Sequence, residues 1–483
     1  MNPFQDLQPE LIWHYFYEIT QTPRPSGKEE KIIAYLKDFA KKFKLELLQD
    51  KTGNILIKKP ATVGKESSPT VILQSHIDMV CEKNTDTIFD FDKDPLKVYV
   101  KDGWVSAEGT TLGGDDGIGV AAELALLAST DIAHPALECL FTVEEETGLT
   151  GAFGIEKGFL SGTVLVNLDS EDDAEVYVGC AGGIDTLVDF NYTPEEAPQT
   201  YEAVKITVNG LSGGHSGGDI HLNRGNANII LAQFIAGEAA KYDIRLAEFT
   251  GGNLRNAIPR EAYAIVLVAE TQEIDLMKNL NDFLAQAKAQ YAVSDPHLSI
   301  SSEAAEKPEK VIDAASQRQL LNAINSCPNG VIGMSEAIEG LVETSTNLAS
   351  VKMQEEGHIL VVTSQRSSSE AAKKAIAKRI NDNFKNNGGI PKHSDGYPGW
   401  SPNLESKVLK VAQTAFNTLH NEDPEIKAIH AGLECGLFLT KYPDLDMISI
   451  GPTIKDAHSP DESMEIKAVT RFWDWLLEIL KNI

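Results

Sequence analysis

The chain has 483 residues, a hydrophobic content of 42% and a formal net charge of −28. The length predicts at least two domains, and the hydrophobic content is enough for large cores. The negative charge argues against binding to nucleic acid or to an anionic membrane, because both attract basic surfaces. The charge alone is typical of a soluble acidic protein, and it also suits one that binds divalent cations.

The five cysteines are widely spaced and include no Cys-x-x-Cys pair. This argues against a disulfide framework and against a thiolate zinc site. The N-terminal region has no basic segment followed by an apolar core, so we expect no signal peptide. No uninterrupted apolar run reaches transmembrane length. We therefore expect a cytoplasmic protein.

The first part of the chain alternates between predicted helices and strands. Ser26 and Glu29 have the spacing of a capping box that opens a helix, and Asp102-Gly103 is typical of a hairpin turn. An apolar, β-branched run predicts a buried strand at residues 70–75. In chain order we expect a helix at 9–20, a second helix ending near 43, strands at 45–48, 54–58 and 70–75, an apolar helix at 120–127, and strands at 137–143 and 163–168. This alternation predicts an α/β domain with a central, mostly parallel sheet.

From about residue 185 the pattern changes to an inserted α+β region. Here we expect two comparable lobes, with strands at 201–209, 262–269, 344–353 and 358–365 and helices at 226–240, 273–291 and 369–383. After a Gly/Pro-rich boundary the α/β pattern resumes, with helices at 403–419 and 464–480 and strands at 427–430 and 447–450. We predict a discontinuous catalytic domain, residues 1–185 and 398–483, interrupted by an inserted domain, residues 186–397.

The stretch at residues 112–119 places Asp115 and Asp116 between glycines, directly before an apolar helix. Glycine lets the backbone approach a ligand closely, and the start of a helix offers free N–H groups. One acid can cap the helix, which leaves the other free to face a site. Taken alone, the stretch is explained equally well as a turn and an N-cap.

Other imidazole and carboxylate groups directly follow the predicted strands. They are His76 and Asp78, the run Glu144-Glu145-Glu146, Asp169 and, late in the chain, His458. The carboxyl ends of parallel strands share one edge of a sheet, so these groups can converge. Each of them alone is also explained as a turn, a loop cap or a surface side chain. Together, two histidines and three carboxylates fit two metal ions that share one acid.

The ordered set of motifs resembles the M20 metallopeptidases over nearly the whole chain. The motifs are His76-Ile77-Asp78, Gly114-Asp115-Asp116, Glu145-Glu146-Thr147-Gly148, Asp169 and His458. Within this family, three further stretches are similar to the aminoacyl-histidine dipeptidase (Xaa-His dipeptidase, peptidase D) branch. They are Gln74-Ser75-His76-Ile77-Asp78-Met79-Val80-Cys81, Gly213-Gly214-His215-Ser216-Gly217 and His430-Ala431-Gly432-Leu433-Glu434-Cys435-Gly436.

The resemblance implies two divalent metal ions and a ligand set for each. Asp115 would bridge both ions, His76 and Asp169 would bind one, and Glu146 and His458 would bind the other. Zinc is the expected metal, with cobalt or manganese as alternatives.

The resemblance also implies the catalytic roles at this centre. Glu145 would be the general base that takes a proton from a metal-bridged water, and Asp78 would orient His76. Because Glu144 is an extra acid beside the family pattern, an alternative register with Glu144 as base and Glu145 as ligand stays open.

The inserted domain would act as a lid and dimerisation domain in this family. His215, in its glycine-rich loop, would stabilise the oxyanion in the site of the partner subunit. Asn256 and Arg366 would hold the substrate carboxylate, since an arginine fork suits a carboxylate. Gly432 would line the pocket.

We therefore expect a cytoplasmic, homodimeric, dinuclear-zinc dipeptidase that cleaves Xaa-His and other unblocked dipeptides and binds neither nucleic acid nor membrane. A carboxylate clamp one residue from the scissile bond explains the selection of dipeptides. One alternative is another M20 hydrolase, such as an aminoacylase, a carboxypeptidase or a tripeptidase. The other is a non-catalytic peptide-binding protein on the same fold, although no ligand or base is missing from the sequence.

Overall fold

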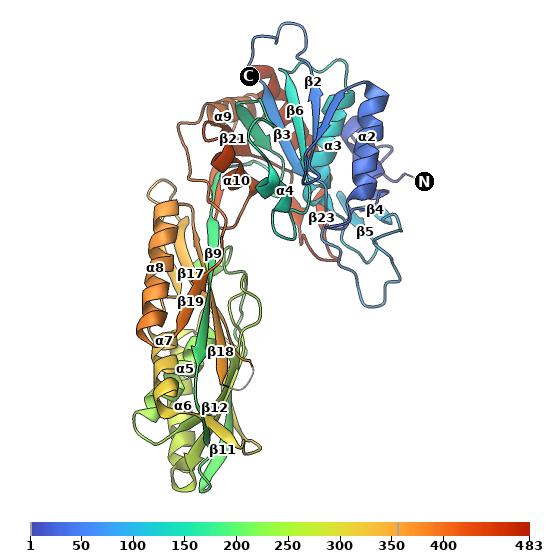
Figure 1. The fold of residues 1–483 in the computed structure, drawn as a ribbon. Coiled ribbons are helices and arrows are strands. Elements are labelled where there is room, and N and C mark those ends of the chain that lie inside the picture. Colours follow the sequence, from blue (N-terminus) through green and yellow to red (C-terminus); the bar gives the residue numbers. More distant parts are fainter. Residues whose placement is uncertain (1, 355–356) are drawn as a thin grey trace. The chain divides into compact units, whose positions relative to one another are not determined.

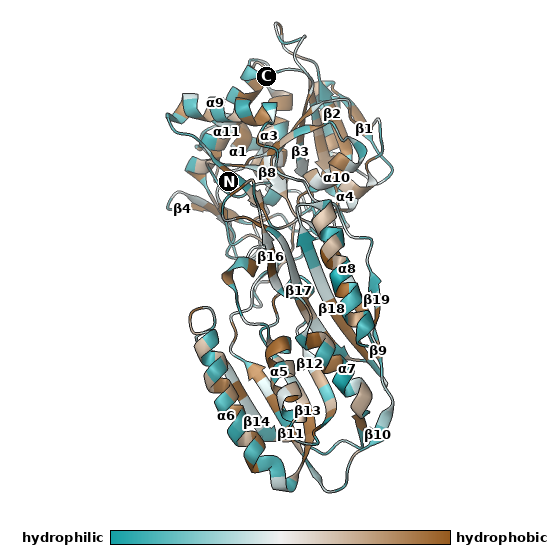
Figure 2. Cartoon of the chain, turned by 90° about the vertical axis from the view of Figure 1, so that its left-hand side faces the viewer, coloured by the Kyte–Doolittle hydropathy of each residue, from teal (hydrophilic) through white to brown (hydrophobic). Residues whose placement is uncertain are grey.

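A computed structural model describes residues 2–354 and 357–483, and Figures 1 and 2 show it from two sides. The chain divides into two compact units. Unit 1 comprises Met1–Gly179, Trp400–Ala428 and Leu433–Ile483, and unit 2 comprises Cys180–Gly399 and Ile429–Gly432. The sequence predicted domain boundaries after residues 185 and 397. It did not predict that residues 429–432 belong to unit 2.

The described part of unit 1 is built on an eight-stranded sheet. Its strands are β1 (Glu46–Gln49), β2 (Ile55–Lys59), β3 (Val71–His76), β6 (Leu137–Thr142), β7 (Val164–Asn167), β8 (Glu175–Cys180), β20 (Glu425–Ile429) and β21 (Asp446–Ser449). The order is β1-β2-β6-β3-β7-β21-β8-β20, and the run from β6 to β21 is parallel. β3 and β6 are buried throughout, as strands covered on both faces should be. The predicted α/β class with a central, mostly parallel sheet is confirmed.

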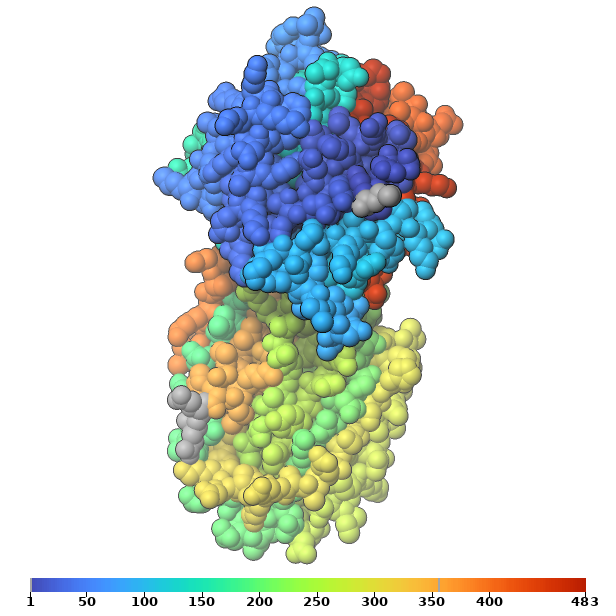
Figure 3. Space-filling view, turned by 90° about the vertical axis from the view of Figure 1, so that its right-hand side faces the viewer, coloured from blue at the N-terminus to red at the C-terminus, as the bar shows by residue number. Residues whose placement is uncertain are grey.

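Helices pack against this sheet and against each other. They are α1 (Glu10–Thr20), α2 (Glu30–Phe43), α3 (Gly114–Ala128), α4 (Thr150–Gly154), α9 (Lys407–His420), α10 (Glu434–Lys441) and α11 (Ile466–Asn482). α3 packs against β3 and α1, and α9 packs against β21 and α11. Figure 3 shows α1 and α2, dark blue, on the surface of unit 1.

A small second sheet in unit 1 contains the predicted hairpin. It has the order β22-β23-β5-β4, with β4 (Val98–Lys101), β5 (Trp104–Ala107), β22 (Ile454–Lys455) and β23 (Ser463–Glu465). The turn between β4 and β5 has positive φ at Asp102 (52°) and Gly103 (86°), as a type I′ turn requires.

The predicted capping box at Ser26 and Glu29 is wrong. α2 begins directly after Glu29, and no side chain caps it. The Ser26 hydroxyl donates instead to Asp78 Oδ2 (2.7 Å), and Glu29 Oε1 accepts the N–H of Glu144 (3.2 Å). Glu29 Oε1 also accepts the N–H of Gly27 (2.8 Å), so the two side chains bond to other groups than the two N–H groups of a capping box.

Unit 2 is built on an antiparallel sheet with helices packed on it. Its strands are β9 (Gly182–Asn191), β11 (Tyr201–Asn209), β12 (Arg245–Gly251), β13 (Ala262–Ala269), β14 (Ser299–Ala304), β16 (Gly330–Met334), β17 (Val342–Met353), β18 (His358–Ser367) and β19 (Ile390–His393). The order is β14-β11-β13-β12-β17-β18-β9-β19, with β16 paired to β17. β12 meets β17 at the single pair Gly251 and Val351, so the sheet has two halves that correspond to the two predicted lobes.

The remaining elements of unit 2 are mostly helices. They are α5 (Ala227–Ala239), α6 (Glu273–Gln290), α7 (Ala314–Asn325) and α8 (Glu370–Asn386), the 3₁₀ helices η1 (Ile220–Leu222) and η2 (Glu270–Gln272), and the pair β10 (Pro194–Glu196) and β15 (Lys310–Ile312). α5 and α6 pack on the first half of the sheet and α8 on the second. Figure 2 shows α5 mostly hydrophobic and α6 mostly hydrophilic, in keeping with their burial. The sequence did not predict α7 or the strands β9, β10, β12, β14, β15, β16 and β19.

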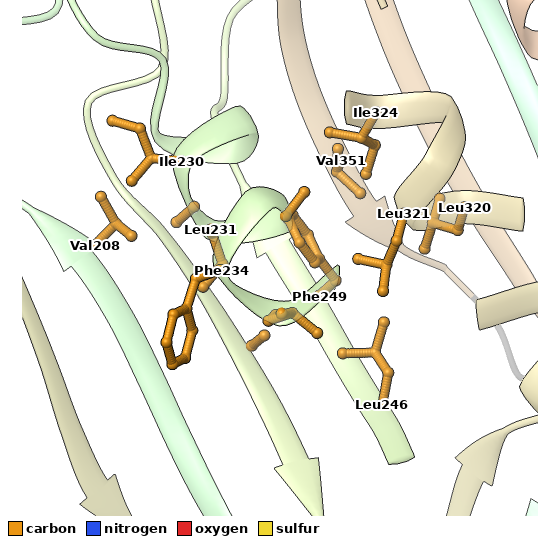
Figure 4. Packing of buried hydrophobic residues seen from close by; sticks show 14 of the residues in the cluster. Val208, Ile230, Leu231, Phe234, Leu246, Phe249, Leu320, Leu321, Ile324 and Val351 are labelled. Atoms are coloured by element: carbon orange, nitrogen blue, oxygen red, sulfur yellow. The ribbon is translucent and has the colours of Figure 1, made fainter. Parts of the chain in front are cut away.

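The core of unit 2 lies between the sheet and α5 and α7. In Figure 4, Phe249 of β12 lies between Leu231 of α5 and Leu321 of α7. All three side chains are almost fully buried, which stabilises the fold by about 2 kcal/mol each. Among the described residues, no helix combines the length and the apolar character needed to cross a membrane.

Candidate metal centre

Three parallel strands of unit 1 end next to one another, and each is followed by candidate ligands. β3 ends in His76, β6 is followed by Glu145 and Glu146, and β7 is followed by Asp169. The registers of β3 with β6 and with β7 bring these strand ends level at one edge. The sequence predicted this convergence from the parallel arrangement.

Two histidines approach the carboxylate of Asp115, one at each oxygen. His76 Nε2 lies 2.9 Å from Asp115 Oδ1 and 3.4 Å from Asp169 Oδ1. His458 Nε2 lies 3.0 Å from Asp115 Oδ2 and 3.1 Å from Glu146 Oε2. Asp115 therefore joins two sets of side chains, each with one imidazole and a further carboxylate.

The potential ligand atoms of the described residues form three overlapping groups, each within 4.8 Å. The groups are His76, Asp115 and Asp169; Asp115, Glu146 and His458; and His76, Glu145 and Glu146. The first two contain every residue that the sequence predicted to bind metal, and Asp115 is common to both. Glu144 belongs to none of the three groups, so the geometry favours the register with Glu145 and Glu146.

Asp78 lies behind His76 and holds the loop that carries the two glutamates. Its Oδ1 accepts the N–H of Glu145 (3.0 Å) and lies 3.4 Å from His76 Nδ1. Its Oδ2 accepts the N–H of Glu146 (3.2 Å) and the hydroxyl of Ser26 (2.7 Å). Because Asp78 is fully buried, these bonds fix the loop of the two glutamates, and they hold the Asp78 carboxylate beside the ring of His76.

α3 begins in an irregular turn that separates Asp115 from Asp116. Neither residue has helical dihedral angles, and the peptide bond between them is cis. The Asp116 carboxylate accepts the N–H of Gly119 (3.1 Å), and a Cβ at Gly119 would collide with that carboxylate. The two acids therefore have different partners, as expected. Asp116 bonds within the first turn of the helix, and Asp115 faces the histidines.

Carboxyl groups outnumber imidazole groups at this edge of the sheet. Burial, with Asp169 nearby, raises the pKa of Glu145 well above its usual range, and burial raises the pKa of Asp169 to about 8. Hydrogen bonds to Asp115 and Glu146 raise the pKa of His458 to about 11. Buried carboxylates of this kind need cations beside them.

The donor set fits divalent transition metals. It consists of imidazole nitrogens and carboxylate oxygens without a thiolate, which suits zinc, manganese or cobalt. Glu146 Oε1 is buried and has no hydrogen-bond partner among the described residues, so it is free to bind a cation. His458 holds φ at 63° and Glu144 at 50°, conformations that cost about 1–3 kcal/mol and cluster at functional sites.

Unit 2 contains a separate group of polar residues around Arg366. Arg366 is 8% exposed, and its Nη1 donates to the hydroxyl of Tyr397 (3.0 Å). A Cβ at Gly432 would lie 3.0 Å from the Tyr397 ring, so the ring occupies the space that a side chain there would need. The sequence predicted a role in substrate binding for Arg366 and Gly432 but none for Tyr397, which lies in the Gly/Pro-rich boundary.

His215 lies in the same unit, on a loop after β11. Its Nδ1 accepts the N–H of Gly218 (3.0 Å), and its own backbone N–H donates to Asp219 (2.9 Å). Burial, then the charge of Arg366, lowers the pKa of His215. The ring is therefore neutral and presents Nε2–H as a donor. Asn256 is exposed, and its carbonyl accepts the N–H of Ser216 (2.8 Å).

His430 completes this group and was not predicted to have a role. Its Nε2 lies 2.7 Å from Ser345 Oγ, and burial followed by Arg366 lowers its pKa to about 3. A Cβ at Gly217 would collide with the carbonyl of His430, so the loop of His215 packs closely against it. His215 and Arg366 come from the two halves of the sheet, and the group forms within one chain.

Comparisons with known proteins show what the whole chain is similar to. The model of a family described as Peptidase family M20/M25/M40 matches residues 72–482. The chain is 42% identical to the cytosol non-specific dipeptidase of Escherichia coli (strain K12), over 100% of this chain and 99% of that protein. The crystal structure of aminoacylhistidine dipeptidase from Vibrio alginolyticus superimposes with a TM-score of 0.91, at 42% identity over 99% of this chain and 98% of that one. Aminopeptidase PepT from Bacillus cereus, with a TM-score of 0.62 and 16% identity over 99% of each chain, shares the fold.

Proposed function

The chain belongs to peptidase family M20/M25/M40, as the sequence predicted, and we propose that it is a dinuclear metal dipeptidase acting on Xaa-His and other unblocked dipeptides. One observation carries the proposal, namely that the two oxygens of Asp115 face two separate sets of imidazole and carboxylate ligands. The names of the two relatives that are 42% identical also support dipeptides as substrates. Unit 1 would be the catalytic domain and unit 2 the lid and dimerisation domain.

Unit 1 would hold two divalent ions, zinc by default and cobalt or manganese as alternatives. His76 and Asp169 would bind one ion, Glu146 and His458 the other, and Asp115 both. Ions held there would act as Lewis acids on the substrate carbonyl and would lower the pKa of a water molecule.

Glu145 is the proposed general base. It accepts a proton from the water that attacks the carbonyl carbon, and it passes this proton to the nitrogen as the C–N bond breaks. Burial, with Asp169 nearby, raises the pKa of Glu145, and cations held beside it would favour the carboxylate form that accepts a proton. Asp78 bonds to the N–H of Glu145 and approaches His76, so it keeps the base beside the ligands.

Unit 2 would supply the groups that recognise the substrate. Arg366, oriented by its bond to Tyr397, keeps further N–H donors for the C-terminal carboxylate. Asn256 would assist it, and Gly432 would line the pocket. His215, neutral and with Nε2–H available, would donate to the oxyanion. A carboxylate bound one residue beyond the scissile bond limits the substrates to dipeptides.

The remaining parts of the proposal concern the whole protein. We propose a cytoplasmic homodimer that binds neither nucleic acid nor membrane. The net charge of −28 and the family resemblance support it. The relative from Escherichia coli is itself named a cytosolic enzyme.

A substrate panel on metal-loaded protein tests this function. It compares an Xaa-His dipeptide with its N-acetylated form, with a tripeptide and with β-alanyl-histidine, before and after removal of metal by a chelator. We expect cleavage of the free dipeptide alone among the first three, lost on metal removal and restored by zinc. Preference for the acetylated form would instead indicate an aminoacylase, and cleavage of none of them in metal-loaded protein would favour a binding protein.

A further inference from the structure

The peptide unit of Gly113 lies between two buried, oppositely charged side chains that come from distant parts of the chain. These are Arg24 and Glu462, each 2% exposed. Neither belongs to the ligand groups of the metal centre. Gly113 is two residues before Asp115, the carboxylate shared by both ligand sets. Contacts that fix this peptide therefore also restrict where Asp115 can lie.

Glu462 holds the loop before Asp115 through its backbone N–H groups. Its Oε2 accepts the N–H groups of Leu112 (2.7 Å) and Gly113 (2.9 Å), and its Oε1 accepts that of Gly114 (2.7 Å). Glu462 is four residues after His458, on the same loop. Its carboxylate thus ties the loop of one predicted ligand to the loop that carries the bridging acid.

Arg24 holds the same peptide from its other side. Its Nη2 donates to the carbonyl of Gly113, while its Nη1 donates to the carbonyls of Asp78 (2.6 Å) and Ile77 (3.2 Å). The backbone carbonyl of Arg24 also accepts the N–H of Met79 (3.1 Å). The guanidinium thus ties the loop that follows His76 to the loop that carries Asp115.

The glycines of this stretch make room for the two charged groups. A Cβ at Gly113 would lie 2.5 Å from Arg24 Nη2, and a Cβ at Gly117 would lie 2.6 Å from the same atom. A Cβ at Gly114 would lie 3.3 Å from Glu462 Oε1. Gly113 also has φ at +65°, which favours glycine. The packing of Arg24 and Glu462 therefore explains three glycines of this stretch, Gly113, Gly114 and Gly117.

We propose that Arg24 and Glu462 are positioning residues that set the separation of the two metal subsites by fixing the Gly113 peptide between the loops of His76 and His458. This rests on the proposed dinuclear site. Charge-assisted hydrogen bonds are shorter and stronger than neutral ones, and the buried guanidinium of Arg24 makes three of them to carbonyls. The two oxygens of Asp115 lie 2.9 Å and 3.0 Å from the two imidazoles, and losing Arg24 or Glu462 would loosen that geometry.

The test is metal binding by Glu462→Gln and Arg24→Lys. The amide of Glu462→Gln presents N–H groups to backbone N–H groups, and the ammonium of Arg24→Lys keeps the charge but loses the fork. The matched control is Glu138→Gln, because Glu138 is a buried carboxylate of unit 1 that also accepts backbone N–H groups, those of Ser161 (2.8 Å) and Gly162 (3.0 Å). Zinc binding to metal-free protein is titrated against a chromophoric chelator, and unfolding temperatures are measured with and without zinc.

We expect both variants to bind at least one of the two zinc ions about 10–100-fold more weakly than wild type, the size of effect typical of groups that orient ligands. Zinc should therefore raise the unfolding temperature of these variants by less than it raises that of wild type. Glu138→Gln unfolds at a lower temperature with or without zinc but keeps both binding constants. If Glu462→Gln does not fold, Glu462→Asp replaces it, since a shorter carboxylate keeps the charge and withdraws from the loop.

The outcomes separate this inference from the proposed function. In one outcome, Glu462→Gln and Arg24→Lys both bind two zinc ions with the same binding constants as wild type and lose only stability, as Glu138→Gln does. That result would overturn the positioning role. Fewer than two zinc ions in wild type would overturn the dinuclear site itself.

Discussion

The two units hold histidines in opposite electrostatic environments. In unit 1, His458 lies among carboxylates, and hydrogen bonds to Asp115 and Glu146 raise its pKa to about 11. In unit 2, His430 is buried beside Arg366, and its pKa falls to about 3. One region is a buried acidic cluster that needs cations, and the other is a group of neutral imidazoles around a guanidinium that suits an anion.

Under the proposed function, this difference would assign the two regions to different parts of a dipeptide. The acidic region suits metal ions that polarise the scissile carbonyl, whereas the region around Arg366 suits the carboxylate at the C-terminus of the substrate. Variants in unit 1 should therefore change the metal content or the chemical step, and variants in unit 2 should change substrate recognition with the metal content intact. The predictions below test this separation.

The largest effect is expected for Glu145→Gln. The amide keeps the size of the side chain but accepts no proton, so kcat should fall by about 10²–10⁴-fold. Metal content, measured by elemental analysis, should stay at the wild-type value, because Glu145 is the proposed base and not one of the proposed ligands. Normal turnover in this variant would remove Glu145 from the mechanism.

The next largest effect is expected for His215→Ala. Loss of one oxyanion donor lowers kcat by about 10²–10³-fold, and the metal content should not change because His215 belongs to unit 2. Elemental analysis and steady-state kinetics of the same preparation measure both. Loss of metal along with activity would instead make His215 a ligand and would break the separation between the regions.

Arg366→Met should act mainly on recognition of the carboxylate. The loss of a charge-assisted bond of about 1.5–3 kcal/mol raises KM by about 10–100-fold. A substrate pair sharpens this test, because wild type should prefer a dipeptide over its C-terminal amide and the variant should not. An unchanged preference for the free carboxylate would show that another group binds it.

The smallest effect concerns stability and comes from His430. Its folded-state pKa of about 3 lies below the unfolded value, so between about pH 6.5 and 3 the unfolded state binds a proton that the folded state does not. The contribution of His430 to stability therefore falls as the pH falls through this window, by about 2 kcal/mol between pH 7 and pH 5. Denaturant unfolding at both pH values should show a change in stability that is less favourable in wild type than in His430→Asn, and the difference between the two changes is this contribution. The same change in both proteins would contradict the account of His430.

The sequence could predict the acidic cluster because its signal is local. His76, Glu145, Glu146 and Asp169 each follow a buried apolar strand, and parallel strands bring their carboxyl ends to one edge. The different positions of Asp115 and Asp116 also follow from neighbours in the chain, because Asp116 bonds to Gly119 within the same turn.

The sequence could not predict the contacts that hold these groups in place. Arg24 bonds to Gly113, which is 89 residues away in the sequence, and Glu462 bonds to Leu112, which is 350 residues away. No pattern within a single element indicates either contact. The same limitation made the capping box wrong, because Ser26 and Glu29 have the correct spacing but bond to other loops. In unit 2, Tyr397 lies in a Gly/Pro-rich segment whose composition predicts only a loop.

The metal content of three proteins tests the central claim most directly. Wild type, Asp115→Asn and the control Asp116→Asn would be loaded with zinc, freed of excess metal and analysed for zinc per chain. The control alters the neighbouring acid, which bonds to Gly119 and is in none of the ligand groups. We predict about two zinc ions per chain in wild type and in Asp116→Asn, and fewer than one in Asp115→Asn. Two zinc ions in Asp115→Asn would contradict the claim that this carboxylate joins the two metal subsites.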